Sequence, residues 1–137
     1  MSIDVFTGSC LCGAVAFRIA GRIKAFYHCH CQRCRKASGT GHASNVIVAL
    51  DSAAWPRGED RLRRFEVPGA RYFYTQFCAD CGSPLPRIAS ERGVAVIPAG
   101  ALDEAPELAP TGRIFQDSRA AWSCHGDGLP AWPQYPT

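Results

Sequence analysis

Hydrophobic positions alternate with polar or small ones in two stretches of the chain. In residues 13–20 the side chains of Val15, Phe17 and Ile19 fall on every second position, which is the period of a strand that buries one face. Residues 43–50 contain a run of β-branched side chains, which is typical of a strand. Both stretches are therefore predicted as strands. No stretch has the sustained 3.6-residue period of a long helix.

Turn residues divide much of the remaining chain into short segments. Gly and Pro are frequent, at 13 and 10 residues, which favours many short elements joined by turns. Two hairpins are predicted, formed by residues 61–67 with 71–77 and by residues 85–88 with 94–98. The other predicted segments are a strand near 113–116, a metal-binding loop at 27–36, a loop with at most one helical turn at 51–60, and a Pro-rich tail from Pro130. The fold class is thus predicted as mostly β.

The composition fits one folded domain with a hydrophobic core. Hydrophobic residues make up 47% of the 137 residues and charged residues 20%, so disorder is not indicated. The first residues lack a basic region followed by an apolar one, and no apolar run approaches the length of a membrane span. We therefore expect a cytoplasmic protein with reduced thiols. The alternative is a disulfide-rich secreted domain without its leader.

The formal charge of the chain changes once its cysteines are considered as ligands. The value of +3 counts cysteines as neutral, whereas metal ligands are thiolates. Ionising seven cysteines and adding two zinc ions brings the net charge from +3 to about zero. A nucleic-acid partner is not expected, because it would need a basic excess or a local basic patch.

Seven of the eight cysteines gather in three clusters. These are Cys10-Leu11-Cys12, Cys29-His30-Cys31-Gln32-Arg33-Cys34 and Cys78-Ala79-Asp80-Cys81. Cysteines two or three residues apart bridge each other only with strain, whereas a tight turn brings their sulfurs to the spacing of tetrahedral zinc. A redox-active pair is the alternative for the last cluster. Three such clusters in a short chain without a leader predict metal binding rather than disulfides.

The number of clustered cysteines predicts two zinc sites. Two pairs make a closed four-thiolate site of the structural type, and the triplet of Cys29, Cys31 and Cys34 leaves an open position of the catalytic type. Spacing alone does not fix which pairs combine. The alternative for the triplet is a second structural site, completed by one of the residues Cys124, His28, His30 and His125. For these histidines we favour an orienting or solvent-facing role, and for Cys124 a buried apolar one.

In this order, the three motifs resemble the glutathione-dependent formaldehyde-activating enzyme family (CENP-V/GFA domain). The matching stretches are residues 8–15 (GSCLCGAV), 29–39 (CHCQRCRKASG) and 77–85 (FCADCGSPL), with shorter matches at 99–103 (AGALD) and 127–130 (DGLP). The resemblance implies an Mss4-like fold of short antiparallel sheets organised around zinc. It also implies that residues 1–137 form a single zinc-binding domain.

The resemblance further implies a role for each cluster. The structural zinc ligands would be Cys10, Cys12, Cys78 and Cys81, and the ligands of a catalytic-type zinc would be Cys29, Cys31 and Cys34. Many relatives carry His-Ile-Phe where this chain has Arg113-Ile114-Phe115. That difference bears on the identity of the substrate.

The open three-cysteine site and the resemblance together predict a zinc-dependent carbon–sulfur lyase or synthase. Its substrate would be an adduct of an aldehyde with glutathione or another small thiol, such as S-(hydroxymethyl)glutathione. Arg33, Arg35 and Lys36 adjoin the site and are candidates for binding substrate carboxylates; the alternative is a solvated charged face. Two other functions stay open, a non-catalytic small-thiol carrier and a zinc-dependent interaction module. No membrane partner is expected, and the patterns do not indicate an oligomeric state.

Overall fold

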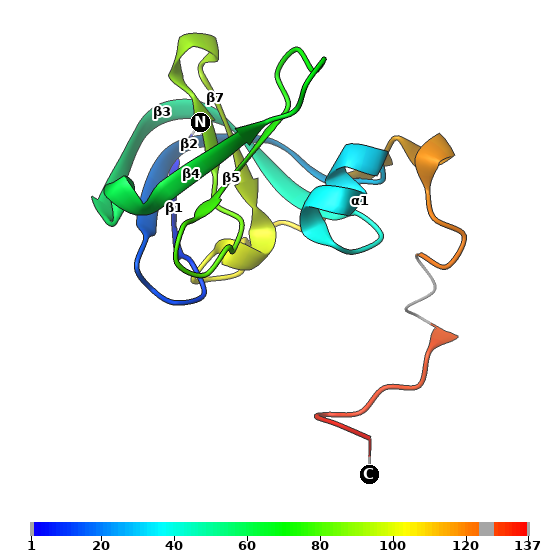
Figure 1. Ribbon diagram of the computed structural model, residues 1–137. Helices are drawn as coiled ribbons and strands as arrows, with labels where there is room; N and C mark the ends of the chain where they lie inside the picture. The colour runs from blue at the N-terminus through cyan, green and yellow to red at the C-terminus, as the bar shows by residue number, and fades with distance from the viewer. Residues whose placement is uncertain (1, 124–127, 137) are drawn as a thin grey trace.

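The computed structural model describes residues 2–123 and 128–136, and most of its regular structure is antiparallel β-sheet (Figure 1). The larger sheet has the strand order β1-β2-β3-β7-β6, and β8 pairs in parallel with the end of β2. These strands are β1 (Asp4–Ser9), β2 (Ala16–Cys29), β3 (Ala43–Arg57), β6 (Arg87–Ala89), β7 (Val94–Pro98) and β8 (Gly112–Ile114). A second sheet pairs β4 (Leu62–Glu66) with β5 (Tyr74–Cys78). The predicted mostly β fold of small antiparallel sheets is confirmed.

Two long strands form the centre of the larger sheet. β2 has 14 residues and β3 has 15, so both run well past the segments predicted at 13–20 and 43–50. The predicted loop at 51–60 is wrong, because β3 continues to Arg57 and only Glu59–Arg61 forms a 3-10 turn. Beyond residue 49, β3 pairs with β2 alone. An edge position of this kind accommodates Pro56, which lacks a backbone N–H.

The two hairpins are confirmed with shifted bounds. β4 pairs antiparallel with β5, and β6 pairs antiparallel with β7. β6 begins only at Arg87, because residues 83–86 instead pair with the end of the other sheet: Cys78 donates its N–H to the Ser83 carbonyl oxygen at 3.2 Å, and Leu85 to that of Gln76 at 2.9 Å. These hydrogen bonds join the two sheets beside the last cysteine cluster.

A short helix stands where a metal-binding loop was predicted. β2 extends to Cys29, and α1 (Gln32–Ser38) follows after two residues. Its N-cap is Cys31, whose Sγ accepts a hydrogen bond from the Cys34 N–H at 3.3 Å. With only seven residues, the helix is too short to show a 3.6-residue pattern in the sequence. Figure 1 shows α1 at one side of the sheets, beyond the end of β2.

The core lies between the sheets. Phe17, Ile19, Val46, Val48 and Ile97 are essentially inaccessible to solvent and come from β2, β3 and β7. In the described residues, no helix is long and apolar enough to span a bilayer. Residues 130–136 form neither helix nor strand, as expected of the Pro-rich tail.

Candidate metal centres

Four cysteines from two distant parts of the chain meet at the edge of the core. Cys10 and Cys12 lie in the turn between β1 and β2, whereas Cys78 ends β5 and Cys81 follows it. Their sulfurs all lie within 4.8 Å of one another. The Sγ–Sγ distance is 3.7 Å between Cys10 and Cys12 and 3.9 Å between Cys12 and Cys78. The backbone at Gly82 has φ of 73°, a left-handed conformation that glycine tolerates and that closes this turn.

Hydrogen bonds favour the thiolate form of part of the four-cysteine cluster. The hydroxyl and N–H of Ser83 lower the pKa of Cys81 to about 6. Burial opposes ionisation of Cys10, but the Val15 N–H, 3.2 Å from its Sγ, holds the pKa below its usual value. At Cys12 the Ala14 N–H favours ionisation, yet burial and the neighbouring sulfurs outweigh it and raise the pKa to about 12. The four thiols therefore need a nearby cation before all can ionise together.

The other three clustered cysteines meet where β2 passes into α1. Cys29 ends the strand, Cys31 caps the helix and Cys34 lies in its first turn, and the three sulfurs lie within 4.8 Å of one another. Burial raises the pKa values of Cys29 and Cys34. Burial also opposes ionisation of Cys31, but hydrogen bonds led by the Cys34 N–H lower its pKa. In this cluster only Cys31 is favoured as a thiolate, and Cys29 and Cys34 need a nearby cation to ionise with it.

Both clusters have the donor chemistry of a metal site. The seven cysteines within the described ranges are all unbridged, so the structure does not have the disulfide arrangement that was the alternative. Closely spaced thiolates are typical ligands of zinc and other soft ions. The groups of four and of three could each hold a metal ion.

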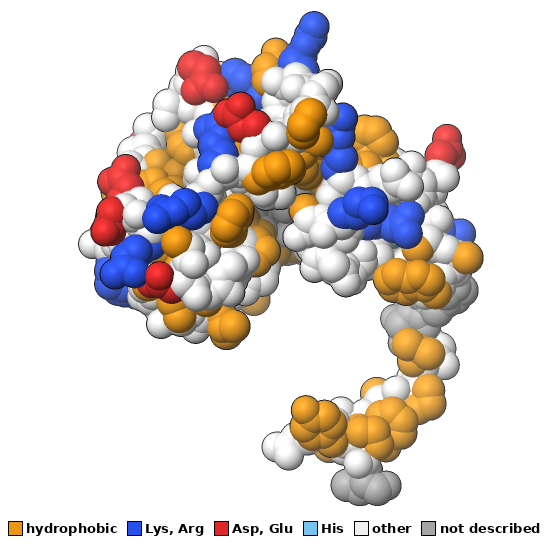
Figure 2. All heavy atoms as spheres, in the orientation of Figure 1, with side chains coloured by type: hydrophobic (Ala, Val, Ile, Leu, Met, Phe, Trp, Pro, Cys, Tyr) orange, Lys and Arg blue, Asp and Glu red, His pale blue; other side chains and the backbone are white. Residues whose placement is uncertain are grey.

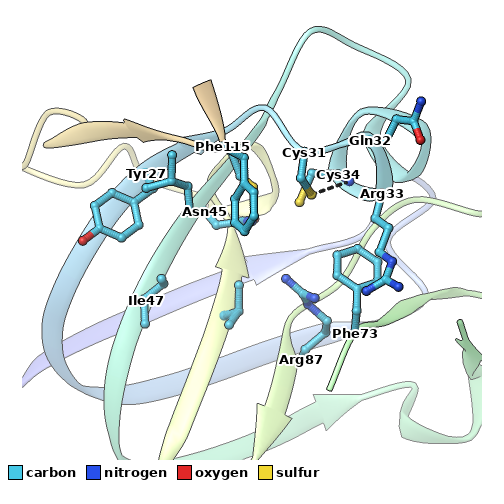
Figure 3. Close-up of a pocket in the computed structure, with 13 residues that line it drawn as sticks. Tyr27, Cys31, Gln32, Arg33, Cys34, Asn45, Ile47, Phe73, Arg87 and Phe115 are labelled. Carbon is cyan, nitrogen blue, oxygen red and sulfur yellow. Dashed lines mark hydrogen bonds between the residues drawn. The ribbon is translucent and has the colours of Figure 1, made fainter. Parts of the chain in front are cut away.

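A cavity of about 490 Å³ opens at the three-cysteine cluster (Figure 3). All three cysteines lie in its wall. The remaining wall contains apolar side chains from several elements together with two arginines; the main contributors are Tyr27, Ile47, Phe73, Val96, Ile114, Phe115, Arg33 and Arg87. The sulfurs are thus accessible to a small molecule.

The predicted substrate-binding residues do not all reach this cavity. Arg33 lies in its wall and is exposed. Arg35 instead donates from Nη1 to the Ser118 carbonyl oxygen at 3.2 Å, and Lys36 is exposed. Neither Arg35 nor Lys36 is part of the cavity wall described here.

Three histidines near the cysteines, His28, His30 and His42, contact one another through their rings. The rings of His28 and His42 lie 3.9 Å apart, and His30 meets His42 edge-on at 5.2 Å. The Ser44 hydroxyl lies 3.2 Å from Nδ1 of His28 and 3.3 Å from Nδ1 of His42. In the described part of the chain, neither metal-capable group includes a histidine. Cys124 and His125, the other candidate fourth ligands, lie outside the described residues.

Two residues of the cavity wall were missed by the sequence reasoning. Arg87 begins β6, and Phe115 follows β8, so both are far along the chain from the cysteine triplet. Phe115 adopts φ of 56°, which is rare for an aromatic residue. The Arg113-Ile114-Phe115 motif was noted for its departure from many relatives, but only the parallel pairing of Cys29 with Ile114 brings this segment to the cysteines.

The fold and the two clusters define a class: β proteins that gather thiols in one group of four and in a second group of three beside a cavity. Within that class, the chain belongs to the GFA family of glutathione-dependent formaldehyde-activating enzymes, whose sequence model matches residues 5–118. A Halomonas elongata protein described as a "Putative glutathione-dependent formaldehyde-activating enzyme" is 36% identical over 86 residues, which cover 57% of this chain. The match spans about half, 52%, of that relative's length.

A solved structure shares the fold. The crystal structure of a Rhodobacter sphaeroides protein superposes with a TM-score of 0.60 at 21% sequence identity. The superposition covers 78% of this chain and 98% of that one. At this level of identity the likeness concerns the fold alone.

Proposed function

We propose that the chain is a zinc-dependent carbon–sulfur lyase or synthase acting on adducts of an aldehyde with glutathione or a similar small thiol. The observation that carries the proposal is the opening of the Cys29, Cys31 and Cys34 cluster into a cavity of about 490 Å³. Membership of the GFA family and the description of the H. elongata relative support this substrate class.

We assign zinc to both clusters because all-thiolate donor sets suit this ion. The group of Cys10, Cys12, Cys78 and Cys81 would hold a structural ion, and the three-cysteine group would hold a second ion beside the cavity. When bound there, zinc would lower the pKa of a substrate thiol and stabilise it as a thiolate. Thiols of this kind persist in reducing compartments, so we place the protein in the cytoplasm.

The residues of the cavity wall would orient the substrate and exclude water from it. Ile47, Val96 and Ile114 are apolar and half-buried, so they limit competing hydration of the aldehyde. Arg33, at the exposed side of the wall, is suited to hold a carboxylate of the thiol. In the synthase direction the sulfur adds to the carbonyl carbon, a C–S bond forms, and the thiol proton ends on the new hydroxyl oxygen. The lyase direction reverses each change.

The test measures zinc content and exchange between formaldehyde, glutathione and S-(hydroxymethyl)glutathione in the same samples. We expect Cys31→Ser to lose the second zinc and the rate enhancement over the spontaneous reaction. Arg35→Met, which changes a side chain outside the cavity, should keep both. Full activity without the second zinc would contradict the proposal. Binding of glutathione by the wild-type protein without any rate enhancement would instead identify a carrier.

A further inference from the structure

Arg87 is a cation set into the wall between two cavities. A second cavity of about 490 Å³ adjoins the one at the cysteines, and the two share Cys34, Asn45, Phe73 and Arg87. The second cavity lies between the C-terminal end of α1 and the 3-10 turn Ala99–Ala101, where the surface is hollowed (Figure 2). A molecule bound at the cysteines therefore meets Arg87 whether it stays in the first cavity or extends into the second.

The protein provides little for this guanidinium to bind. Arg87 is half-buried, and burial lowers its pKa. Its Nη1 donates to the Tyr74 carbonyl oxygen at 3.4 Å, longer than a well-formed N–H···O hydrogen bond, and its guanidinium lies 5.0 Å from the centre of the Phe73 ring. In the ranges 2–123 and 128–136, the ion pairs formed by arginines involve Arg61 and Arg64. No described carboxylate therefore neutralises Arg87.

The orientation of the side chain suits an anion that arrives with the substrate. In Figure 3 the guanidinium of Arg87 points up toward Cys31 and Cys34, beside the ring of Phe73. The attraction of this cation to the ionised forms of Cys34, Cys29 and Cys31 raises its pKa and so partly offsets the effect of burial. A guanidinium retains its charge when partly buried and presents a planar fork of donors that matches a carboxylate.

We propose that Arg87 is an acid-binding residue for a carboxylate-bearing thiol whose sulfur lies at the three-cysteine cluster. This inference rests on the proposed function and narrows it, because it selects acidic thiols over neutral ones. It also moves the main recognition of the acidic group from the helix residues Arg35 and Lys36 to a strand residue 53 positions beyond Cys34. The exposed Arg33 can contribute at the rim, but a half-buried ion pair is less screened by water and salt.

The experiment measures binding rather than turnover, on the zinc-loaded full chain. Four probes are titrated by calorimetry: glutathione, its diethyl ester, S-methylglutathione and 2-mercaptoethanol. S-methylglutathione keeps both carboxylates without a free thiol, so it reports on the acid-binding residue independently of sulfur at the metal. The wild-type protein should bind glutathione more tightly than its diethyl ester.

Arg87→Met should weaken the binding of glutathione and S-methylglutathione by about 10- to 100-fold, as expected for a lost hydrogen-bonded charge. It should leave the ester and 2-mercaptoethanol nearly unchanged. Arg87→Lys keeps the positive charge but not the planar pair of donors. It should lose less affinity for glutathione and S-methylglutathione than Arg87→Met does. Arg35→Met is the matched control and should bind all four probes as the wild type does.

Equal weakening of charged and esterified probes in Arg87→Met would overturn the proposal, because it would indicate a structural role. An unchanged affinity for glutathione, or a wild-type protein without preference for it over the ester, would also overturn the proposal. Charge-dependent binding that needs Arg87 in a protein without turnover would support this inference while contradicting the proposed catalytic function.

Discussion

Among the described glycines, Gly58 is the one at which an added Cβ would come closest to another atom. It follows the last residue of β3, and its φ of 78° lies in the left-handed region. A Cβ at this position would overlap the carbonyl oxygen of Ala14, next to the turn that carries Cys10 and Cys12. The close approach brings the end of β3 onto that turn, and Arg57 strengthens the contact by donating from Nε to the Gly13 carbonyl oxygen at 2.8 Å.

We predict that Gly58→Ala destabilises the protein more than Gly69→Ala does. Both glycines have positive φ, at 78° and 80°, but only Gly58 has atoms within 4 Å of an added Cβ. The left-handed strain costs about 1 kcal/mol at either position, and the overlap should add about 1–3 kcal/mol at Gly58. Guanidinium denaturation of the zinc-loaded variants measures the difference. An equal loss of unfolding free energy in the two variants would contradict this prediction, because it would show that the backbone shifts to relieve the overlap at no cost in stability.

At the scale of elements, α1 depends on a residue that is also a candidate metal ligand. Cys31 caps the helix through its sulfur, which accepts the Cys34 N–H at 3.3 Å. A helix of seven residues has little stability of its own. The stability of α1 would therefore depend on the capping sulfur, on the packing of Cys34 and on a bound metal, all of which involve its first turn.

Substitutions of Cys31 can separate the capping role from the metal-binding role. Serine is a good N-cap and alanine is a poor one, whereas neither supplies a thiolate. We expect Cys31→Ser and Cys31→Ala to lose the second zinc alike, with Cys31→Ala less stable than Cys31→Ser by about 1 kcal/mol. Zinc analysis and urea denaturation give the two quantities. If the two variants are equally stable, a side-chain cap at this position contributes nothing to the stability of the protein.

At the scale of the whole molecule, the four-cysteine cluster joins parts of the chain that are far apart in sequence. The sulfurs of Cys12 and Cys78 lie 3.9 Å apart although 66 positions separate the residues. One pair belongs to the start of the larger sheet and the other to the end of the smaller sheet. An ion held there would link the two sheets, whereas the three-cysteine group lies beside a short helix and a cavity.

We therefore predict that the two groups differ in their effect on stability. Cys81→Ser should lower Tm on the order of 10 °C or more, because a structural zinc contributes folding free energy. Cys29→Ser should lower Tm by less while removing one zinc equivalent. Differential scanning calorimetry with zinc analysis measures both. A larger loss in Cys29→Ser would contradict the assignment of the closed group as structural.

Local sequence patterns predicted the elements that are determined by residues close together in the sequence. The alternation around Phe17, the turn residues of the hairpins and the cysteine spacing are each visible within about ten residues. The second half of β3 was missed because its residues are mostly exposed, and only pairing with β2 defines it as a strand. The seven clustered cysteines form the same groups of four and of three that the family resemblance implied. That they bind zinc stays a prediction.

Arg87 and Phe115 could not be assigned to the site from the sequence for a related reason. No motif near either residue carries the chemistry of the cysteines, and each reaches the cavity only through strand pairing, β6 with β7 and β8 with β2. The charged residues next to the triplet in sequence were the natural candidates. Helix formation turned Arg35 toward Ser118 instead.

The placement of β2 bears on how ions bound at the two cysteine groups would exchange. This strand begins shortly after Cys12 and ends with Cys29, so its path, on the order of 40 Å at ~3.3 Å per residue, separates the two sets of sulfurs along the chain. A sulfur from one set cannot replace a missing partner in the other while the strand is intact. Displacement of an ion from the three-cysteine group by a competing ion would therefore leave the ligands of the four-cysteine group in place, and the proposed second zinc could be restored by zinc alone without refolding.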